Sequence, residues 1–193
     1  MSNTIIFATN NKNKVAEVKN ILNGQFEVLS LQEAGITIDI PEPYDTLEEN
    51  ASTKSKTIHQ LTKKNCFSED TGLFVDALNG EPGVKSARYA GDDANNEANI
   101  AKLLTRLSNN IDRKARFRTI ISLILDEKEF QFEGVCEGDI QYQKKGNQGF
   151  GYDAIFVPDG ADKSFAEMSM EEKAMYSHRK KAMNKLIAFL SKK

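Results

Sequence analysis

Hydrophobic positions along this chain switch between the two periods that distinguish strands from helices. Thr4–Thr9 is a short apolar run typical of a buried strand, and the apolar residues that follow recur at helical spacing. Val15, Val18 and Leu22 would share one face of a helix over Lys14–Leu22. The sequence NNKNK joins the two segments, so the strand-to-helix turn consists of asparagine and lysine and contains no glycine.

The next elements follow from the same pattern. Phe26–Ser30 and the alternating run Ile36–Ile40 favour strands, and the segment PEPY then interrupts the chain. Asp45 is a suitable N-cap, with Glu48 three residues later, for a helix that continues to about Asn65.

The middle of the chain predicts both strands and a helix. CFSED is a short strand that ends in two acids, and the apolar run LFVDAL follows it. DDANNEANIAKLLTRL predicts a helix that turns Ile100, Ala101, Leu104 and Leu107 inward. ARFRTIISLILD and EFQFEGVCEG are most simply a hairpin, and GDIQYQ favours another strand. KKGNQGFGYD is then a glycine-rich loop before a strand AIFV.

The C-terminal stretch is helical but interrupted. Ser169 and Glu172 form an N-terminal cap, yet one continuous helix would turn Lys173 and His178 roughly 140° apart. We therefore predict a short helix near residues 170–175, a break near Ser177 and a last helix. Its inward residues would be Ala182, Met183, Leu186, Ile187 and Leu190.

Length and composition narrow the class of protein. A chain of 193 residues suits one sizeable core, so we expect a single domain over residues 1–193. The formal charge of −2 lacks the basic excess of proteins that bind nucleic acid or membrane surfaces. The start MSNTIIF does not resemble a signal peptide, and no apolar stretch approaches the ~20 residues that span a bilayer. We expect a cytoplasmic protein whose partners include neither nucleic acid nor membrane.

The cysteines and histidines do not suggest a metal centre. Cys66 and Cys136 lie far apart in strand-like apolar surroundings, which favours buried, reduced thiols. With only His59 and His178 in addition, these spacings do not supply a zinc site.

Two helix starts carry basic and polar residues. A helix N-terminus has unpaired backbone N–H groups, and the amides and ammonium groups of NNKNK add donors that suit phosphate oxygens. The break near Ser177 would put His178 and Arg179 in the first turn of the last helix, which also favours an anion.

Acidic residues suggest a magnesium site. Glu69 and Asp70 end a buried strand, where paired carboxylates are costly unless they bind a cation or act as acid and base. Magnesium prefers carboxylate oxygens together with substrate phosphates. In the helix that precedes this strand, Lys54 falls within the apolar stripe, and periodicity leaves both Glu48 and Glu49 open as metal ligands.

The loop GNQGFGYD could hold a flat ligand. Glycines beside Phe150 and Tyr152 let the backbone approach closely, an aromatic ring could stack on a base, and Asp153 could accept a hydrogen bond. Each of these features also has a purely structural interpretation: a solvated turn, loop acids, a snorkelling lysine or a tight hairpin. Together they describe a site for a magnesium-bound nucleoside triphosphate.

Several segments, in this order and spacing, resemble the inosine triphosphate pyrophosphatase family. They are FATNNKNK, LEENASTK, EDTGLFVDALNGEPGVKSARYAG, GFGYDAIF, EEK and SHR, and the similarity covers about residues 4 to 190. The resemblance implies hydrolysis of ITP, dITP and XTP to the monophosphate and pyrophosphate, which cleanses the nucleotide pool. It also implies an α/β fold: an elongated two-lobed domain with a long mixed sheet flanked by helices and an active-site cleft between the lobes. Mg²⁺ as cofactor and a homodimer are likewise implied.

The resemblance also assigns roles to residues. Asp70 would be the proton acceptor, and Glu49 and Asp70 would bind magnesium. The residues implied in substrate binding are Thr9, Asn10, Asn11, Lys12, Asn13, Lys14, Lys54, Thr71, Phe150, Gly151, Tyr152, Asp153, Lys173, His178 and Arg179. Phe150 would stack on the base, and the last three would read its 6-keto edge, which adenine lacks.

Two residues depart from the pattern of many relatives. Asn10 replaces a glycine, and we expect it to tolerate a positive φ in the turn. Glu69 replaces an aspartate, which leaves its role open. Two other classes remain as alternatives: a Maf-type pyrophosphatase for other modified nucleotides, against which the SHR ending argues, and a non-catalytic nucleotide-binding regulator, against which Glu49 and Asp70 argue.

Overall fold

A computed structural model of the protein describes residues 4–22, 24 and 26–192. Its N-terminal part is organised around three parallel strands. Strand β1 (Thr4–Phe7) pairs in parallel with β2 (Glu27–Ser30) on one side and with β3 (Cys66–Val75) on the other. Met1–Asn3, the first residues of the segment tested for a signal peptide, lie outside the described residues.

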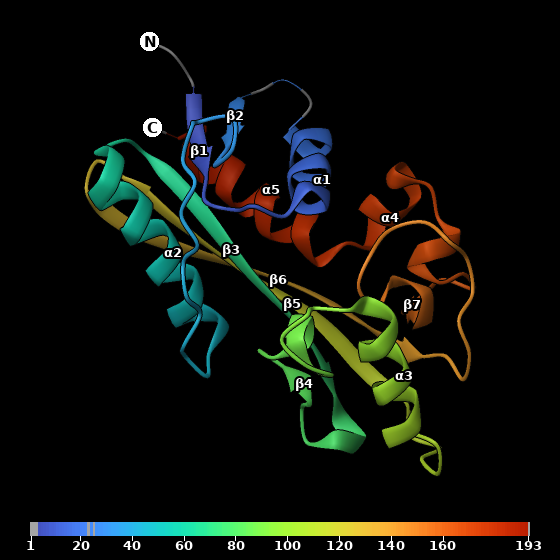
Figure 1. The fold of residues 1–193 in the computed structure, drawn as a ribbon. Coiled ribbons are helices and arrows are strands. Elements are labelled where there is room, and N and C mark those ends of the chain that lie inside the picture. The colour runs from blue at the N-terminus through green and yellow to red at the C-terminus, as the bar shows by residue number, and fades with distance from the viewer. Residues whose placement is uncertain (1–3, 23, 25, 193) are drawn as a thin grey trace. The chain divides into compact units, whose positions relative to one another are not determined.

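The complete sheet is mixed. Its strands follow the order β2-β1-β3-β5-β6-β7, and the short β4 (Pro82–Gly83) pairs antiparallel with β3. Strands β5 (Lys114–Leu125) and β6 (Lys128–Ile140) form the predicted hairpin, and β7 (Phe156–Pro158) pairs antiparallel with β6. The predicted α/β class, with a mixed sheet flanked by helices, is therefore confirmed (Figure 1).

The chain packs as two compact units. Unit 1 comprises residues 1–70, 119–134 and 179–193, and unit 2 comprises residues 71–118 and 135–178. Strands β3, β5 and β6 each run from one unit into the other. The single domain over residues 1–193 stays a prediction.

In unit 1, side chains alternate between two apolar clusters. Ile5 and Phe7 of β1 belong to a cluster that includes buried residues of α1 (Lys12–Leu22) and α5 (His178–Leu190). Ile6 belongs to a second cluster, which includes Ile58 of α2 (Leu47–Thr62). Because successive side chains of a strand point to opposite faces, the sheet has α1 and α5 on one side and α2 on the other.

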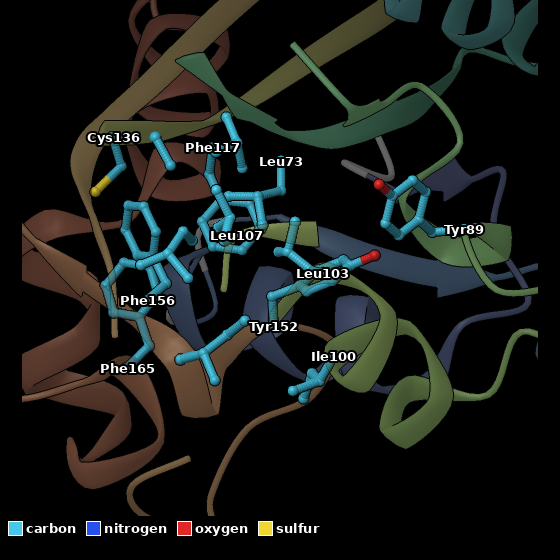
Figure 2. Packing of buried hydrophobic residues seen from close by; sticks show 14 of the residues in the cluster. Leu73, Tyr89, Ile100, Leu103, Leu107, Phe117, Cys136, Tyr152, Phe156 and Phe165 are labelled. Atoms are coloured by element: carbon cyan, nitrogen blue, oxygen red, sulfur yellow. The ribbon is translucent and has the colours of Figure 1, made fainter. Parts of the chain in front are cut away.

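Unit 2 has its own core, shown in Figure 2. Helix α3 (Asn96–Arg106) contributes Ile100 and Leu103, and the ring of Phe117 meets the ring of Phe156 edge-on with centroids 4.8 Å apart. Helix α4 (Met170–Tyr176) and four short 3₁₀ helices complete the described secondary structure; the latter span Asp76–Leu78, Ser86–Arg88, Asp153–Ile155 and Phe165–Glu167.

Several details of the sequence prediction are wrong. Strand β3 does not end at the acids of CFSED but continues to Val75, and GDIQYQ is not a separate strand because β6 ends at Ile140 within it. Ile36–Ile40 is irregular rather than a strand: Ile36 is buried in the cluster that includes Ile58, Ile38 and Ile40 pack against it partly buried, and the backbone does not join the sheet. In α3, Ala101 is exposed, and Leu103 is buried instead. Thr46, not Asp45, caps α2 by accepting a hydrogen bond from the backbone N–H of Glu49 at 3.2 Å.

The predicted break in the C-terminal stretch is confirmed. Ser169 and Glu172 form a capping box at the start of α4, and Ser177 separates α4 from α5. His178 and Arg179 are consequently the first residues of α5. Of the predicted inward residues, Ala182, Met183 and Leu186 are fully buried, and Ile187 and Leu190 are partly buried.

The two cysteines are buried free thiols, as predicted. The Sγ of Cys66 donates to the carbonyl oxygen of Ser55 at 3.2 Å, and burial raises the pKa of Cys66 to about 12. Within the described residues, no helix is both long and apolar enough to cross a membrane.

Candidate active site

The turn between β1 and α1 is organised by Asn11. Its side-chain oxygen accepts hydrogen bonds from the backbone N–H groups of Asn13 at 3.0 Å and Lys14 at 3.2 Å, so Asn11 acts as the N-cap of α1. The backbone N–H of Asn11 in turn donates to the Oγ1 of Thr9 at 3.2 Å. Two of the predicted phosphate-binding residues thus shape the turn itself.

The remaining residues of this turn lie at the surface. Asn10, Lys12 and Asn13 are exposed, and the amide of Asn10 donates to the carbonyl oxygen of Ile38 at 3.3 Å. The expected positive φ of Asn10 is wrong, since Asn10 is not among the described residues that have one. The turn therefore does not require the left-handed conformation that glycine favours.

Lys54 is a buried cation held between two carboxylates. Its side chain lies on α2 and is 9% exposed, and its Nζ lies 3.1 Å from the Oδ1 of Asp70. The same Nζ also pairs with the Oε1 of Glu42, which comes from the PEPY segment. Lys54 is thus a paired internal charge and not a lysine that extends its head into water.

These charges affect one another. Burial acts to lower the pKa of Lys54, but Asp70 and Glu42 outweigh it, and the pKa of Lys54 is raised. Burial raises the pKa of Asp70 above its usual value, against the attraction of Lys54 and Lys14. A carboxylate whose pKa is raised toward neutrality is a better general base than an ordinary aspartate.

The two glutamates at the start of α2 make different contacts from those of Glu42. The carboxylate of Glu49 accepts a hydrogen bond from the Oγ1 of Thr46 at 2.6 Å and belongs to the helix cap. The backbone oxygen of Glu48 accepts from the side chain of Gln131 at 3.2 Å. Among Glu42, Glu48 and Glu49, the described contact with the ammonium group of Lys54 is made by Glu42.

Glu69 and Arg179 form the second charged group of unit 1. The guanidinium of Arg179 donates to both oxygens of Glu69, at 2.7 and 2.8 Å, and also pairs with Glu17 of α1. The Nζ of Lys14 lies 3.1 Å from the Oε1 of Glu69. Arg179, expected to read the base, is held here by acids of unit 1.

The glycine-rich loop of unit 2 is tied together by Asp153. Its Oδ2 accepts from the backbone N–H of Phe150 at 2.9 Å and from the Nζ of Lys173 at 2.7 Å. That Nζ lies 5.3 Å from the centre of the Phe150 ring and 5.3 Å from that of Phe165. Asp153, which we expected to accept a hydrogen bond, therefore does so within the loop.

Two other predicted residues of unit 2, Tyr152 and His178, are held by contacts with buried parts of that unit. The hydroxyl of Tyr152 donates to the carbonyl oxygen of Ser86 at 2.9 Å, and burial raises the pKa of Tyr152. The ring of His178 stacks on Phe117 with centroids 4.7 Å apart. Gly151 has a φ of +61°, and Thr71 is partly buried in β3.

The predicted residues thus divide between the two units. Unit 1 contains Thr9, Asn10, Asn11, Lys12, Asn13, Lys14, Glu49, Lys54, Asp70 and Arg179; unit 2 contains Thr71, Phe150, Gly151, Tyr152, Asp153, Lys173 and His178. Asp70 and Thr71 are consecutive, as are His178 and Arg179, so the division falls within two pairs of predicted site residues.

Sequence reasoning missed Glu42. One local signal could have found it: Pro41 and Pro43 flank this residue, and prolines on both sides restrict the backbone of an acid that must point in a fixed direction. Its partner lies 12 residues further on. No periodic pattern connects the two positions, because Glu42 precedes the helix.

The acids of unit 1 fit a magnesium ion better than a metal that needs many protein ligands. In the described ranges, no group of three or more His, Cys, Asp or Glu side chains is placed to hold a metal. The carboxylates of Asp70 and Glu42 do, however, converge on one cation, the ammonium group of Lys54. Mg²⁺ is usually held by one or two carboxylates together with substrate phosphates, so these residues fit it.

A mixed sheet flanked by helices is also the architecture of solved structures that this chain resembles. The family model described as the Ham1 family matches residues 5–189. The chain belongs to the Ham1 family.

Proteins similar to this chain include curated relatives and solved structures. A dITP/XTP pyrophosphatase from Flavobacterium johnsoniae is 48% identical over 97% of both chains, and one from Porphyromonas gingivalis is 49% identical over 96% of both. The structure of the Staphylococcus aureus Ham1 protein has a TM-score of 0.87 at 42% identity and covers 97% of this chain and 98% of that one. A HAM1 protein from Coxiella burnetii gives 0.89 at 34% identity, with 98% and 99% covered.

Gly149 and Gly151 offer a matched test of the loop. Both have positive φ, but a Cβ on Gly149 would lie 2.1 Å from the Oδ2 of Asp153, whereas a Cβ on Gly151 would meet nothing within 4 Å. Gly149→Ala should lower the free energy of unfolding by about 1–3 kcal/mol more than Gly151→Ala does, because it also displaces a charged hydrogen-bond acceptor. Urea unfolding followed by circular dichroism measures the difference; equal losses would contradict it.

Proposed function

We propose that this protein hydrolyses the triphosphates of deaminated purines, ITP, dITP and XTP, to the nucleoside monophosphate and pyrophosphate. The observation that carries the proposal is the buried carboxylate of Asp70, which lies 3.1 Å from the ammonium of Lys54 in a chain of the Ham1 family. The names of the similar proteins support the same reaction. A cytoplasmic location and a homodimer remain predictions.

Unit 1 would bind the triphosphate. Lys14, Lys54 and the start of α1 supply positive charge and hydrogen-bond donors for phosphate oxygens. Phosphoryl transfer depends mainly on such neutralisation of charge and on positioning, and much less on covalent catalysis by the protein. Asp70 would orient the attacking water and take its proton, since burial raises the pKa of Asp70 toward the working range of a general base. The bond that breaks joins the α- and β-phosphates, and pyrophosphate leaves.

Magnesium would be held by Asp70 together with Glu42 or Glu49. Bound there, it would neutralise phosphate charge. The contacts favour Glu42, because its carboxylate already meets the cation that Asp70 contacts, whereas that of Glu49 accepts from Thr46. Lys54 would then exchange part of its pairing with these acids for phosphate oxygens.

Unit 2 would recognise the base. A purine stacked on Phe150 would lie near the ammonium of Lys173, which stands 5.3 Å from the centre of that ring. Inosine and xanthosine present a carbonyl acceptor at C6, and adenosine presents an amino donor, so an ammonium favours the deaminated bases. We assign base reading to Lys173 and His178, which belong to the same unit as Phe150.

Asp70→Asn should lower the rate of pyrophosphate release from dITP by at least about 100-fold, because the amide cannot accept the proton of water. Calorimetry should show that nucleotide binding is retained. Asp76→Asn, which alters an exposed acid that follows the same strand, serves as the control. Turnover by Asp70→Asn within a few-fold of the wild type would remove Asp70 from the catalytic role.

Glu42→Gln and Glu49→Gln separate the two candidate magnesium ligands. If Glu42 is the ligand, Glu42→Gln should raise the magnesium concentration for half-maximal pyrophosphate release by about 10-fold or more, and Glu49→Gln should leave it nearly unchanged. The measurement is a magnesium titration at saturating dITP. The reverse order of the two effects would assign the ligand to Glu49.

Lys173→Met keeps most of the aliphatic stem and removes the ammonium group. The ratio of kcat/KM for dITP to that for dATP should fall by about 10- to 100-fold, since a donor to the 6-keto group is lost. The ratio is taken within one variant, so a change in stability affects both substrates alike. Lys163→Met, at an exposed lysine of unit 2, is the control. An unchanged ratio would argue against base reading by Lys173.

A further inference from the structure

Glu69 lies at the centre of a buried group of charges within unit 1. Its side chain is fully buried, and that of Arg179 is 2% exposed. The two form a bidentate pair, with Nε to Oε2 at 2.7 Å and Nη2 to Oε1 at 2.8 Å. Arg179 also pairs with Glu17, and Lys14 approaches the Oε1 of Glu69 at 3.1 Å.

The contacts keep Glu69 charged and fixed. Burial alone would raise the pKa of Glu69, but Arg179 and Lys14 hold it well below its usual range. A planar guanidinium bound to both oxygens of a carboxylate fixes its orientation as well as its position. Glu69 therefore presents Oε1 to Lys14 in a direction that Arg179 determines.

Lys14 gains a defined position from this contact. A lysine has a long flexible stem, and a free ammonium group would lose much conformational freedom on binding a phosphate. The side chain of Lys14 is 17% exposed, so it is accessible while one of its donors is engaged by Glu69. The contact at 3.1 Å restricts where this ammonium group can lie.

We propose that Glu69 is a positioning residue: it holds the ammonium group of Lys14 ready for a phosphate oxygen, and is itself fixed by Arg179. Glu69 does not touch the substrate and acts through Lys14. The inference rests on the proposed function, because it takes Lys14 to bind the triphosphate. It assigns Arg179 to the support of the phosphate-binding unit.

A double-mutant cycle tests the coupling. The variants are Glu69→Gln, Lys14→Met and the combination, and the measurement is the affinity for inorganic triphosphate by calorimetry in metal-free buffer. Glu69→Gln should weaken binding by about 10-fold in the wild-type background and by less than about 2-fold in the Lys14→Met background. A merely structural role would weaken both backgrounds equally, so equal losses would overturn the proposal.

Two further variants sharpen the test. Glu17→Gln removes the other acid that holds Arg179 but leaves the Glu69–Lys14 contact, so it should change the affinity by less than about 3-fold. If circular dichroism shows that Glu69→Gln does not fold, Glu69→Asp takes its place in the cycle. It keeps the charge that Arg179 needs and withdraws the carboxylate from Lys14 by one methylene, and the same loss of effect in the Lys14→Met background is expected.

The affinity for inorganic triphosphate is measured without turnover, so it tests the positioning role separately from the proposed function. A wild-type protein that binds inorganic triphosphate but releases no pyrophosphate from dITP would overturn the proposed function and leave the positioning role to be decided by the cycle. A wild-type protein that does not bind inorganic triphosphate would overturn the positioning role, because Lys14 would then have no phosphate to receive.

Discussion

Mutual compensation of buried charges is the constraint on which unit 1 depends. Glu69 and Arg179 could not be buried singly, since an uncompensated ion in a protein interior is strongly destabilising. Their pairing joins β3 to the first turn of α5, and Glu17 and Lys14 extend it to α1. These ion pairs therefore fix the strand and the two helices to one another.

Unit 2 applies the same principle with fewer charges and more rings. Asp153 and Lys173 neutralise each other, and the carboxylate also organises the loop around Phe150. Aromatic faces of Phe150 and Phe165 lie near the ammonium group, so a cation is stabilised by ring quadrupoles as well as by its partner acid. Unit 1 therefore holds its buried charges through ion pairs, whereas unit 2 combines an ion pair with the faces of two aromatic rings.

Much of the fold could be predicted because burial is periodic. The stripe of α1 and the break before α5 follow from the spacing of a few apolar residues and caps. Ile36–Ile40 shows the limit of this approach, since alternation records which side chains are buried and not whether the backbone joins a sheet. The site was harder: Glu69 and Arg179 are 110 residues apart, and no local pattern encodes such a pair. Family resemblance supplied candidate site residues, but it did not indicate that Glu42 contacts Lys54.

The buried thiols have a consequence for chemical durability. Oxidants and alkylating agents react with the thiolate, and a cysteine whose pKa is raised to about 12 is almost wholly protonated near neutral pH. Cys66 is also fully buried and donates to a backbone oxygen. Since β3 runs from Cys66 directly to Asp70, the strand that carries the candidate catalytic acid begins at a residue that oxidative stress would leave unmodified.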